Sequence, residues 1–92
     1  MAEIDVRLRK EGAAHIADVT VKDRAVTAHR VRVSLADIDK YGARDDIAGL
    51  VRRSFEFLLA REPNTSILRE FALSTIERYY PEYAQEIRRP VS

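Results

Sequence analysis

The sequence predicts an α+β fold, in which a small N-terminal antiparallel sheet of two or three strands packs against C-terminal α-helices. The chain has 92 residues, which is the size of a single domain. Apolar and polar residues tend to alternate over residues 3–34, as in strands, whereas apolar residues recur at helical spacing over residues 45–89. We therefore expect residues 3–34 to be mainly β and residues 35–89 to be mainly α, with residues 90–92 as a frayed tail.

The expected sheet begins with Ile4, Val6 and Leu8, which alternate with charged residues and give a strand with one charged face. Two further alternating runs follow at residues 15–22 and 26–33. A short turn candidate separates these two runs, so we expect them to form an antiparallel hairpin.

The register of this hairpin stays open, because no Asn-Gly or Asp-Gly pair fixes its turn. A two-residue loop at residues 23–24 would place Asp18 opposite His29. A three-residue loop would instead place His15 opposite Val31. We favour the shorter loop.

Capping signals mark the first two helices. Ser34 starts a near-complete capping box, and Gly42 is expected to end the short helix that follows. Either Asp45 or Asp46 is expected to cap the principal helix at residues 47–61. The apolar residues of that helix cover an arc of about 200°, wider than the roughly 100° stripe that covers one surface. We therefore expect this helix to contact two partners.

The C-terminal part is expected to consist of several short segments. Pro63 ends the principal helix, because proline disfavours helical geometry in the residue before it. Ser66 begins a short segment with three apolar residues. Residues 74–77, Ser-Thr-Ile-Glu, form a complete capping-box motif that opens a further helix. Pro81 is expected either to kink that helix or to stand at the first position of a final one.

Three stretches carry a resemblance: TAHRVRVS at residues 27–34, SFEFLLAREP at residues 54–63 and RYYPEY at residues 78–83. Together they resemble a group of short bacterial proteins of uncharacterised function. The resemblance implies a free-standing bacterial domain. It brings no activity, ligand or catalytic residue with it.

The composition argues against several function classes. There are 16 Lys and Arg residues against 15 Asp and Glu residues, and a dedicated nucleic-acid binder normally shows a clear basic excess. The chain has no cysteine, hence no disulfide, thiolate metal site or cysteine nucleophile. Its three glycines are too scattered for a phosphate-binding loop, and no standard catalytic signature is found. We expect no enzyme activity, no cofactor and no metal.

The sequence also bears on localisation. The N-terminus lacks the apolar stretch of a signal peptide, and the longest apolar run, at residues 57–60, is far too short to span a membrane. We therefore expect a cytoplasmic protein.

Two histidines are the remaining candidates for chemistry. In the favoured register Asp18 faces His29, and a carboxylate beside an imidazole can serve catalysis or metal binding. No third ligand or nucleophile stands at a suitable spacing from His15 and His29. We expect a structural cross-strand pair instead, worth roughly 0.2–1 kcal/mol.

Four arginines alternate with apolar residues in the expected strands: Arg7, Arg9, Arg30 and Arg32. On one face of a shared sheet they could bind phosphates, which makes weak nucleic-acid binding the alternative function. Carboxylates in the same strands would cancel much of their field, and no aromatic residue precedes Tyr41 to stack bases. We expect a solvated, ion-paired face.

The leading hypothesis is a small non-enzymatic protein-interaction or self-associating module of a bacterial cytoplasm. Tyrosines are favoured in interfaces, and the principal helix has a wider apolar arc than a small domain buries easily. The candidate interface residues are Leu50, Phe57, Tyr79 and Tyr83. The partner would be a second copy of the chain or an unidentified protein. Alternatively, the tyrosines close the core.

Overall fold

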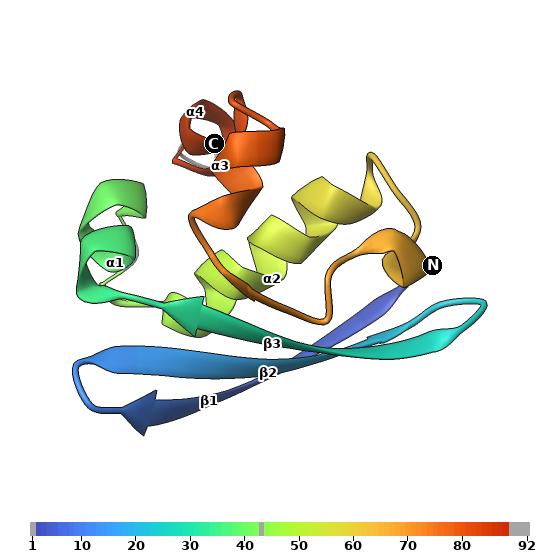
Figure 1. Ribbon diagram of the computed structural model, residues 1–92, viewed down its shortest axis with the longest axis horizontal. Coiled ribbons are helices and arrows are strands. Elements are labelled where there is room, and N and C mark those ends of the chain that lie inside the picture. The colour runs from blue at the N-terminus through green and yellow to red at the C-terminus, as the bar shows by residue number, and fades with distance from the viewer. Residues whose placement is uncertain (1, 43, 89–92) are drawn as a thin grey trace.

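The computed structural model describes residues 2–42 and 44–88 and shows a mixed sheet with helices on one face (Figure 1). The strands are β1 (Glu3–Glu11), β2 (Ala14–Lys22), β3 (Val26–Val33) and β4 (Glu70–Ala72), in that order across the sheet. The helices are α1 (Leu35–Tyr41), α2 (Ile47–Leu59), α3 (Thr75–Tyr79) and α4 (Tyr83–Ile87), with a 3₁₀ turn, η1 (Asn64–Ser66), after α2. α2 lies between the sheet and the two C-terminal helices (Figure 1).

The predicted α+β class is confirmed, but the sheet differs from the prediction. It has four strands rather than two or three, and it is not purely antiparallel, because β4 pairs parallel with β3. β4 was not predicted. Three residues are too few to show alternation, and no local motif marks the long return that a parallel pair requires.

Gly12 shapes the first hairpin. β1 and β2 are joined by a two-residue loop, with Glu11 opposite Ala14, and Gly12 at the first loop position has a φ of 62°. A glycine with positive φ at that position is typical of a type II′ turn, whose twist matches that of paired strands.

The second hairpin adopts neither of the two registers that the sequence left open. Lys22 pairs with Val26 across a three-residue loop. Asp18 consequently lies opposite Arg30, and the expected pairing of Asp18 with His29 was wrong.

Burial explains why the favoured two-residue loop was wrong. The observed register puts the buried valines of β2 and β3 on the same inner face of the sheet. A slip of one residue would turn the arginines of β3 toward the core. The alternative had the correct loop length of three residues but the wrong pairing, because His15 lies opposite Val33 and not Val31.

The capping predictions are confirmed for α1 and α2. Ser34 caps α1 with a full capping box, and Gly42 ends it with a φ of 69°. Asp46, one of the two candidates, caps α2 by accepting a hydrogen bond from the backbone of Gly49. α2 ends at Leu59, slightly before the predicted end at residue 61.

Two predictions for the C-terminal part, at Ser74 and Pro81, were wrong. Ser74 precedes α3, but its side chain makes no capping hydrogen bond, so the predicted capping box does not form. Pro81 neither kinks a continuous helix nor takes the first position of α4, because it lies in a turn between α3 and α4. The predicted tail at residues 90–92 lies outside the described residues.

The wide apolar arc of α2 is accommodated inside the chain. Leu50, Val51 and Phe55 on this helix are fully buried. α2 contacts β1 of the sheet and also contacts α4, whose Tyr83 is itself fully buried. The two partners expected for this helix are therefore two parts of the same molecule.

Candidate functional site

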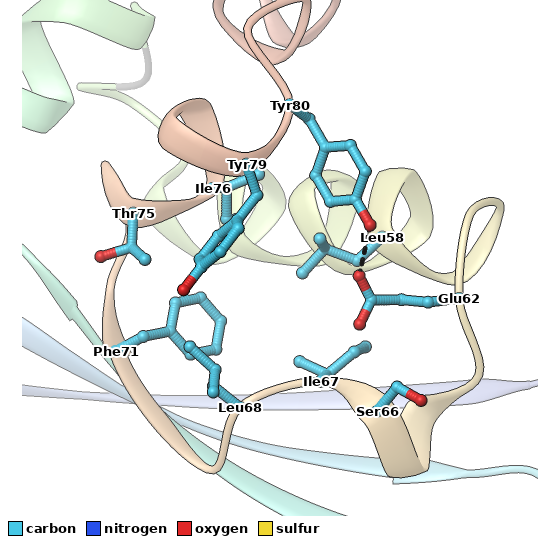
Figure 2. Close-up of a pocket in the computed structure, with 10 residues that line it drawn as sticks. All are labelled: Leu58, Glu62, Ser66, Ile67, Leu68, Phe71, Thr75, Ile76, Tyr79 and Tyr80. Atoms are coloured by element: carbon cyan, nitrogen blue, oxygen red, sulfur yellow. Dashed lines mark hydrogen bonds between the residues drawn. The ribbon is translucent and has the colours of Figure 1, made fainter.

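An apolar groove of about 250 Å³ lies between α3 and the segment that leads into β4 (Figure 2). Its lining comes from the end of α2, from residues 66–71 and from α3: Leu58, Glu62, Ser66, Ile67, Leu68, Phe71, Thr75, Ile76, Tyr79 and Tyr80. Because three segments contribute to it, the groove exists only in the folded chain.

The groove has a buried floor and an exposed rim. Leu58, Ile67 and Ile76 form the floor and are 5%, 6% and 3% exposed. Leu68 and Tyr79 form the rim and are 49% and 68% exposed (Figure 2). Exposed apolar side chains that gather over an apolar floor mark interaction sites, whereas single scattered ones do not.

A hydrogen-bonded pair supplies the polar side of the groove. The Tyr80 hydroxyl donates to the carboxylate of Glu62 at 2.6 Å (Figure 2). This hydrogen bond, together with partial burial, raises the pKa of the Tyr80 hydroxyl above its ordinary value. At neutral pH Tyr80 is therefore a hydrogen-bond donor and not a base.

A chain of hydrogen bonds holds the groove segment against the β2–β3 hairpin. Asn64 donates to the Thr27 hydroxyl at 3.0 Å, and that hydroxyl lies 2.8 Å from Nε2 of His29. Nδ1 of His29 lies 2.8 Å from the carbonyl of Leu68. Because a carbonyl can only accept, Nδ1 of His29 donates to the Leu68 carbonyl, and in the neutral imidazole Nε2 accepts from the Thr27 hydroxyl. His29 therefore positions the groove wall, which is a structural role.

Asn64 also explains the register of the second hairpin. Its side chain donates to the carbonyl of Ala25 at 2.9 Å, and Ala25 lies in the loop between β2 and β3. This bond comes from residues far along the chain. Sequence reasoning about the hairpin alone had no access to it.

The structure does not bring the histidine candidates together. Asp18 binds arginines on the outer face of the sheet, whereas His29 is buried on the inner face. His15 lies roughly 13 Å from His29 along the ladder, at about 3.3 Å per residue, and its buried Nδ1 has no hydrogen-bond partner within the described part of the chain. Among the described residues, no group of three or more His, Asp or Glu side chains could hold a metal ion.

The four arginines of the alternative hypothesis do share the outer face of the sheet. The ladder places Arg7 and Arg30 on either side of Asp18. It places Arg9 and Arg32 on either side of Ile16 in the same way.

Carboxylates neutralise much of this face. Asp18 lies 3.1 Å from Arg9 and 3.4 Å from Arg30, while Arg7 lies 3.5 Å from Asp5. The hydrogen bond from Arg9 is the main reason that the pKa of Asp18 is lower than its ordinary value. These contacts match the ion-paired face that the sequence favours.

Three of the four candidate interface residues belong to the core. Leu50, Phe57 and Tyr83 are 0%, 8% and 0% exposed, so the tyrosine of α4 closes the core over α2. Tyr79 is exposed and forms part of the groove rim.

Sequence reasoning missed Leu68, the other rim residue. A signal was available, because neighbouring residues of an extended segment point to opposite sides. The adjacent apolar residues Ile67 and Leu68 could not both face inward, and the structure buries Ile67.

No protein-family model, curated protein or solved structure matches this chain. Within residues 2–42 and 44–88, none of the helices combines the length and apolar character that crossing a bilayer requires.

Proposed function

We propose that this chain is a protein-interaction module rather than an enzyme, and that the groove receives an apolar side chain of a partner protein. The observation that carries the proposal is the exposed rim of Leu68 and Tyr79 above a floor that is already packed. Aromatic and other large side chains over a preformed apolar hollow are frequent anchors of protein interfaces. Covering this rim would remove apolar surface from water without rearranging the core.

The open edge of β4 favours a partner in extended conformation. The Arg69 carbonyl and the Leu73 N–H bond to β3, so the backbone groups of the intervening Glu70 and Ala72 point away from it. An added strand could pair with these groups beside the groove. Such a partner would gain main-chain hydrogen bonds at β4 and place a side chain over the apolar floor.

The polar groups of the groove suit recognition better than acid–base chemistry. A general base works best with a pKa near the working pH, whereas the pKa of Tyr80 is raised further from neutrality. Glu62 is occupied by the Tyr80 hydroxyl. The second carboxylate oxygen of Glu62 can accept a backbone N–H of the partner.

Selection from a random displayed-peptide library on the immobilised protein tests this proposal. We expect enriched peptides to alternate large apolar and polar residues, and a synthetic peptide to shift amide signals around the groove. Leu68→Glu should abolish this binding. Leu35→Glu is the matched control, because Leu35 lies on α1 and is 57% exposed. The groove is not the docking site if no peptide is enriched or if the enriched peptides tolerate Leu68→Glu.

Weak nucleic-acid binding stays the alternative because the four arginines share a face. A phosphate would have to displace the carboxylates that engage Arg7, Arg9 and Arg30. We therefore expect no retardation of DNA or RNA even at low salt. Retardation that falls steeply with added salt and disappears in Arg30→Ala would favour the alternative instead.

A further inference from the structure

The free edge of β1 lies on the opposite side of the sheet from β4 and is nine residues long. Its hairpin closes with Glu11 opposite Ala14, and the closing pair of a two-residue loop exchanges both backbone hydrogen bonds. Hydrogen-bonded and non-hydrogen-bonded pairs alternate along an antiparallel ladder. The backbone N–H and C=O groups of Ile4, Val6 and Leu8 therefore point away from β2, beyond the edge of the sheet.

One observed contact agrees with the outward direction of these backbone groups. Arg52 of α2 donates a hydrogen bond to the carbonyl of Ile4 from outside the sheet. A long edge strand with outward backbone groups is a template for a further strand. The side chains of β1 indicate what sequence of charged and apolar residues the added strand needs.

The side chains of β1 form a self-complementary pattern. Along the outer face two acids are followed by two bases: Glu3, Asp5, Arg7 and Arg9. Along the inner face stand three apolar residues: Ile4, Val6 and Leu8. The side chains of Asp5 and Arg7 are 61% and 83% exposed, and Leu8 is 38% exposed. The outer face is therefore accessible at this edge, and the inner face is accessible at Leu8, whereas Ile4 and Val6 are half-buried against the core.

Two identical antiparallel strands related by a two-fold axis share one residue that faces itself. If that residue is Val6, Asp5 faces Arg7 of the other copy, and Glu3 faces Arg9. On the inner face Ile4 then meets Leu8, and Val6 meets Val6. Over residues 3–9 every charge is opposite its counterpart, and every apolar residue is opposite an apolar one, whereas Lys10 and Glu11 lie beyond this matched stretch.

The neighbouring registers would place like charges opposite one another. With Asp5 or Arg7 on the axis, that residue faces its own copy. With Ile4 on the axis, Glu3 faces Asp5, and with Leu8 on the axis the two arginines of the strand face each other. Like charges directly opposite one another destabilise paired strands.

We propose that β1 pairs antiparallel with β1 of a second copy of this chain, about a two-fold axis at Val6. The outward backbone groups of Ile4 then bond to those of Leu8 in the other copy, and two four-stranded sheets become one. The contact uses the same strand in both copies, so it closes as a dimer. Arg52 can retain its bond, because the Ile4 carbonyl has two lone pairs.

This dimer is reversible and sensitive to salt. A contact between two strands buries less surface than the roughly 1,200–2,000 Å² of stable complexes. Its exposed charge pairs are screened by added ions. The inference goes beyond the proposed function, since it concerns the other edge of the sheet and does not depend on the groove.

Charge exchange tests the pairing. Arg7→Asp makes Asp5 face an acid in the second copy, and Asp5→Arg makes Arg7 face a base. We expect each variant alone to weaken dimerisation tenfold or more, measured by sedimentation equilibrium at several concentrations. An equimolar mixture of the two variants restores complementarity, so it should form heterodimers about as tightly as the wild type. A folding defect in either variant would not be repaired by mixing.

Arg32→Glu is the matched control, because it reverses a charge on the same outer face but on β3. It should leave the dimer unchanged. A wild type that stays monomeric at all concentrations overturns the proposal, and so does a mixture that fails to associate.

Single cysteines read the register, because the natural chain has none. Val6→Cys brings two thiols together across the axis, within reach of a short bifunctional crosslinker. Leu8→Cys places them about four residues apart along the ladder, roughly 13 Å at 3.3 Å per residue. We expect rapid crosslinking of Val6→Cys and at least tenfold slower crosslinking of Leu8→Cys. Equal rates, or faster crosslinking of Leu8→Cys, contradict the register about Val6.

Discussion

The two edges of the sheet expose backbone groups in different surroundings. β4 is three residues long, and an apolar groove borders it. β1 is nine residues long, and side chains of both charges border it. The short edge suits a partner that brings an apolar side chain, whereas the long edge suits a partner with a matching order of charges. An unpaired strand is therefore not specific by itself, and the side chains beside it decide what can pair.

The largest effect on stability should come from the buried floor of the groove beside β4. Leu58→Ala should lower the free energy of unfolding by about 2–5 kcal/mol, because it removes buried apolar surface and leaves a cavity. Leu68→Ala at the rim should change it by no more than about 0.5 kcal/mol. Urea denaturation followed by circular dichroism measures both. Equal losses would mean that Leu68 is part of the core and not available to a partner.

The hydrogen-bond chain that fixes the groove wall should give the next effect. Thr27→Val removes the group between Asn64 and His29 and leaves their buried polar atoms without it, at a cost of about 1–3 kcal/mol. Thr20→Val, on the outer face, should stay within about 0.5 kcal/mol. The same denaturation series compares them. A loss for Thr27→Val no larger than that for Thr20→Val would show that the hydrogen bonds through Thr27 contribute nothing to stability.

Amide hydrogen exchange separates the two sets of backbone groups on β1. In dilute solution the N–H groups of Asp5 and Arg7, which face β2, should exchange at least tenfold more slowly than those of Val6 and Leu8. Raising the protein concentration should slow the outward set selectively, as pairing with a second copy covers it. Nuclear magnetic resonance at two concentrations measures this. Outward amides that are already slow in dilute solution would contradict the assigned phase of the ladder.

The smallest effect concerns two ion-paired carboxylates, Asp18 on β2 and Glu77 on α3. The pKa of Asp18 is lowered mainly by Arg9, and that of Glu77, on α3, mainly by Lys40. A carboxylate with a lowered pKa in the folded state stabilises the protein above its unfolded pKa, and this contribution is lost as pH falls through the folded value.

Wild-type stability should therefore decline as pH falls below the ordinary values of 3.8 for Asp18 and 4.5 for Glu77. Asp18→Asn and Glu77→Gln should each flatten part of that decline, and only slightly, because both groups are solvated. Thermal melts between neutral pH and about pH 3 measure the slopes. Variants with the full wild-type slope would show that neither ion pair contributes to stability.

Local sequence signals were reliable where one segment supplies its own stabilising contacts. Ser34, Gly42 and Asp46 cap helices through bonds to neighbouring backbone groups. Ser34 and Gly42 were readable from the chain, and Asp46 was one of two candidates. The same signal failed at Ser74, where the chain enters α3 from β4 in a conformation that keeps its hydroxyl from capping. A capping motif predicts a helix start but not the geometry of entry.

The candidate site was mostly beyond reach of the sequence. Tyr79 was identified, but Leu68 was not, and Leu50, Phe57 and Tyr83 were assigned to a surface that the fold covers. The width of the apolar arc on α2 was correctly read. What covers the side of that arc that faces away from β1 depends on the return of residues 70–87, which no periodicity in α2 can reveal.

By itself, the sequence determined the α+β class, the helices capped by Ser34 and Asp46, and the alternation of charged and apolar residues in β1, because these depend on neighbouring residues and their period. Only the tertiary structure decided the register of the second hairpin, the parallel pairing of β4 and the groove. Each of these depends on contacts between residues far apart in the chain, such as that from Asn64 to the carbonyl of Ala25. Contacts of that kind become favourable only when the whole core forms, so they leave no local pattern in the sequence.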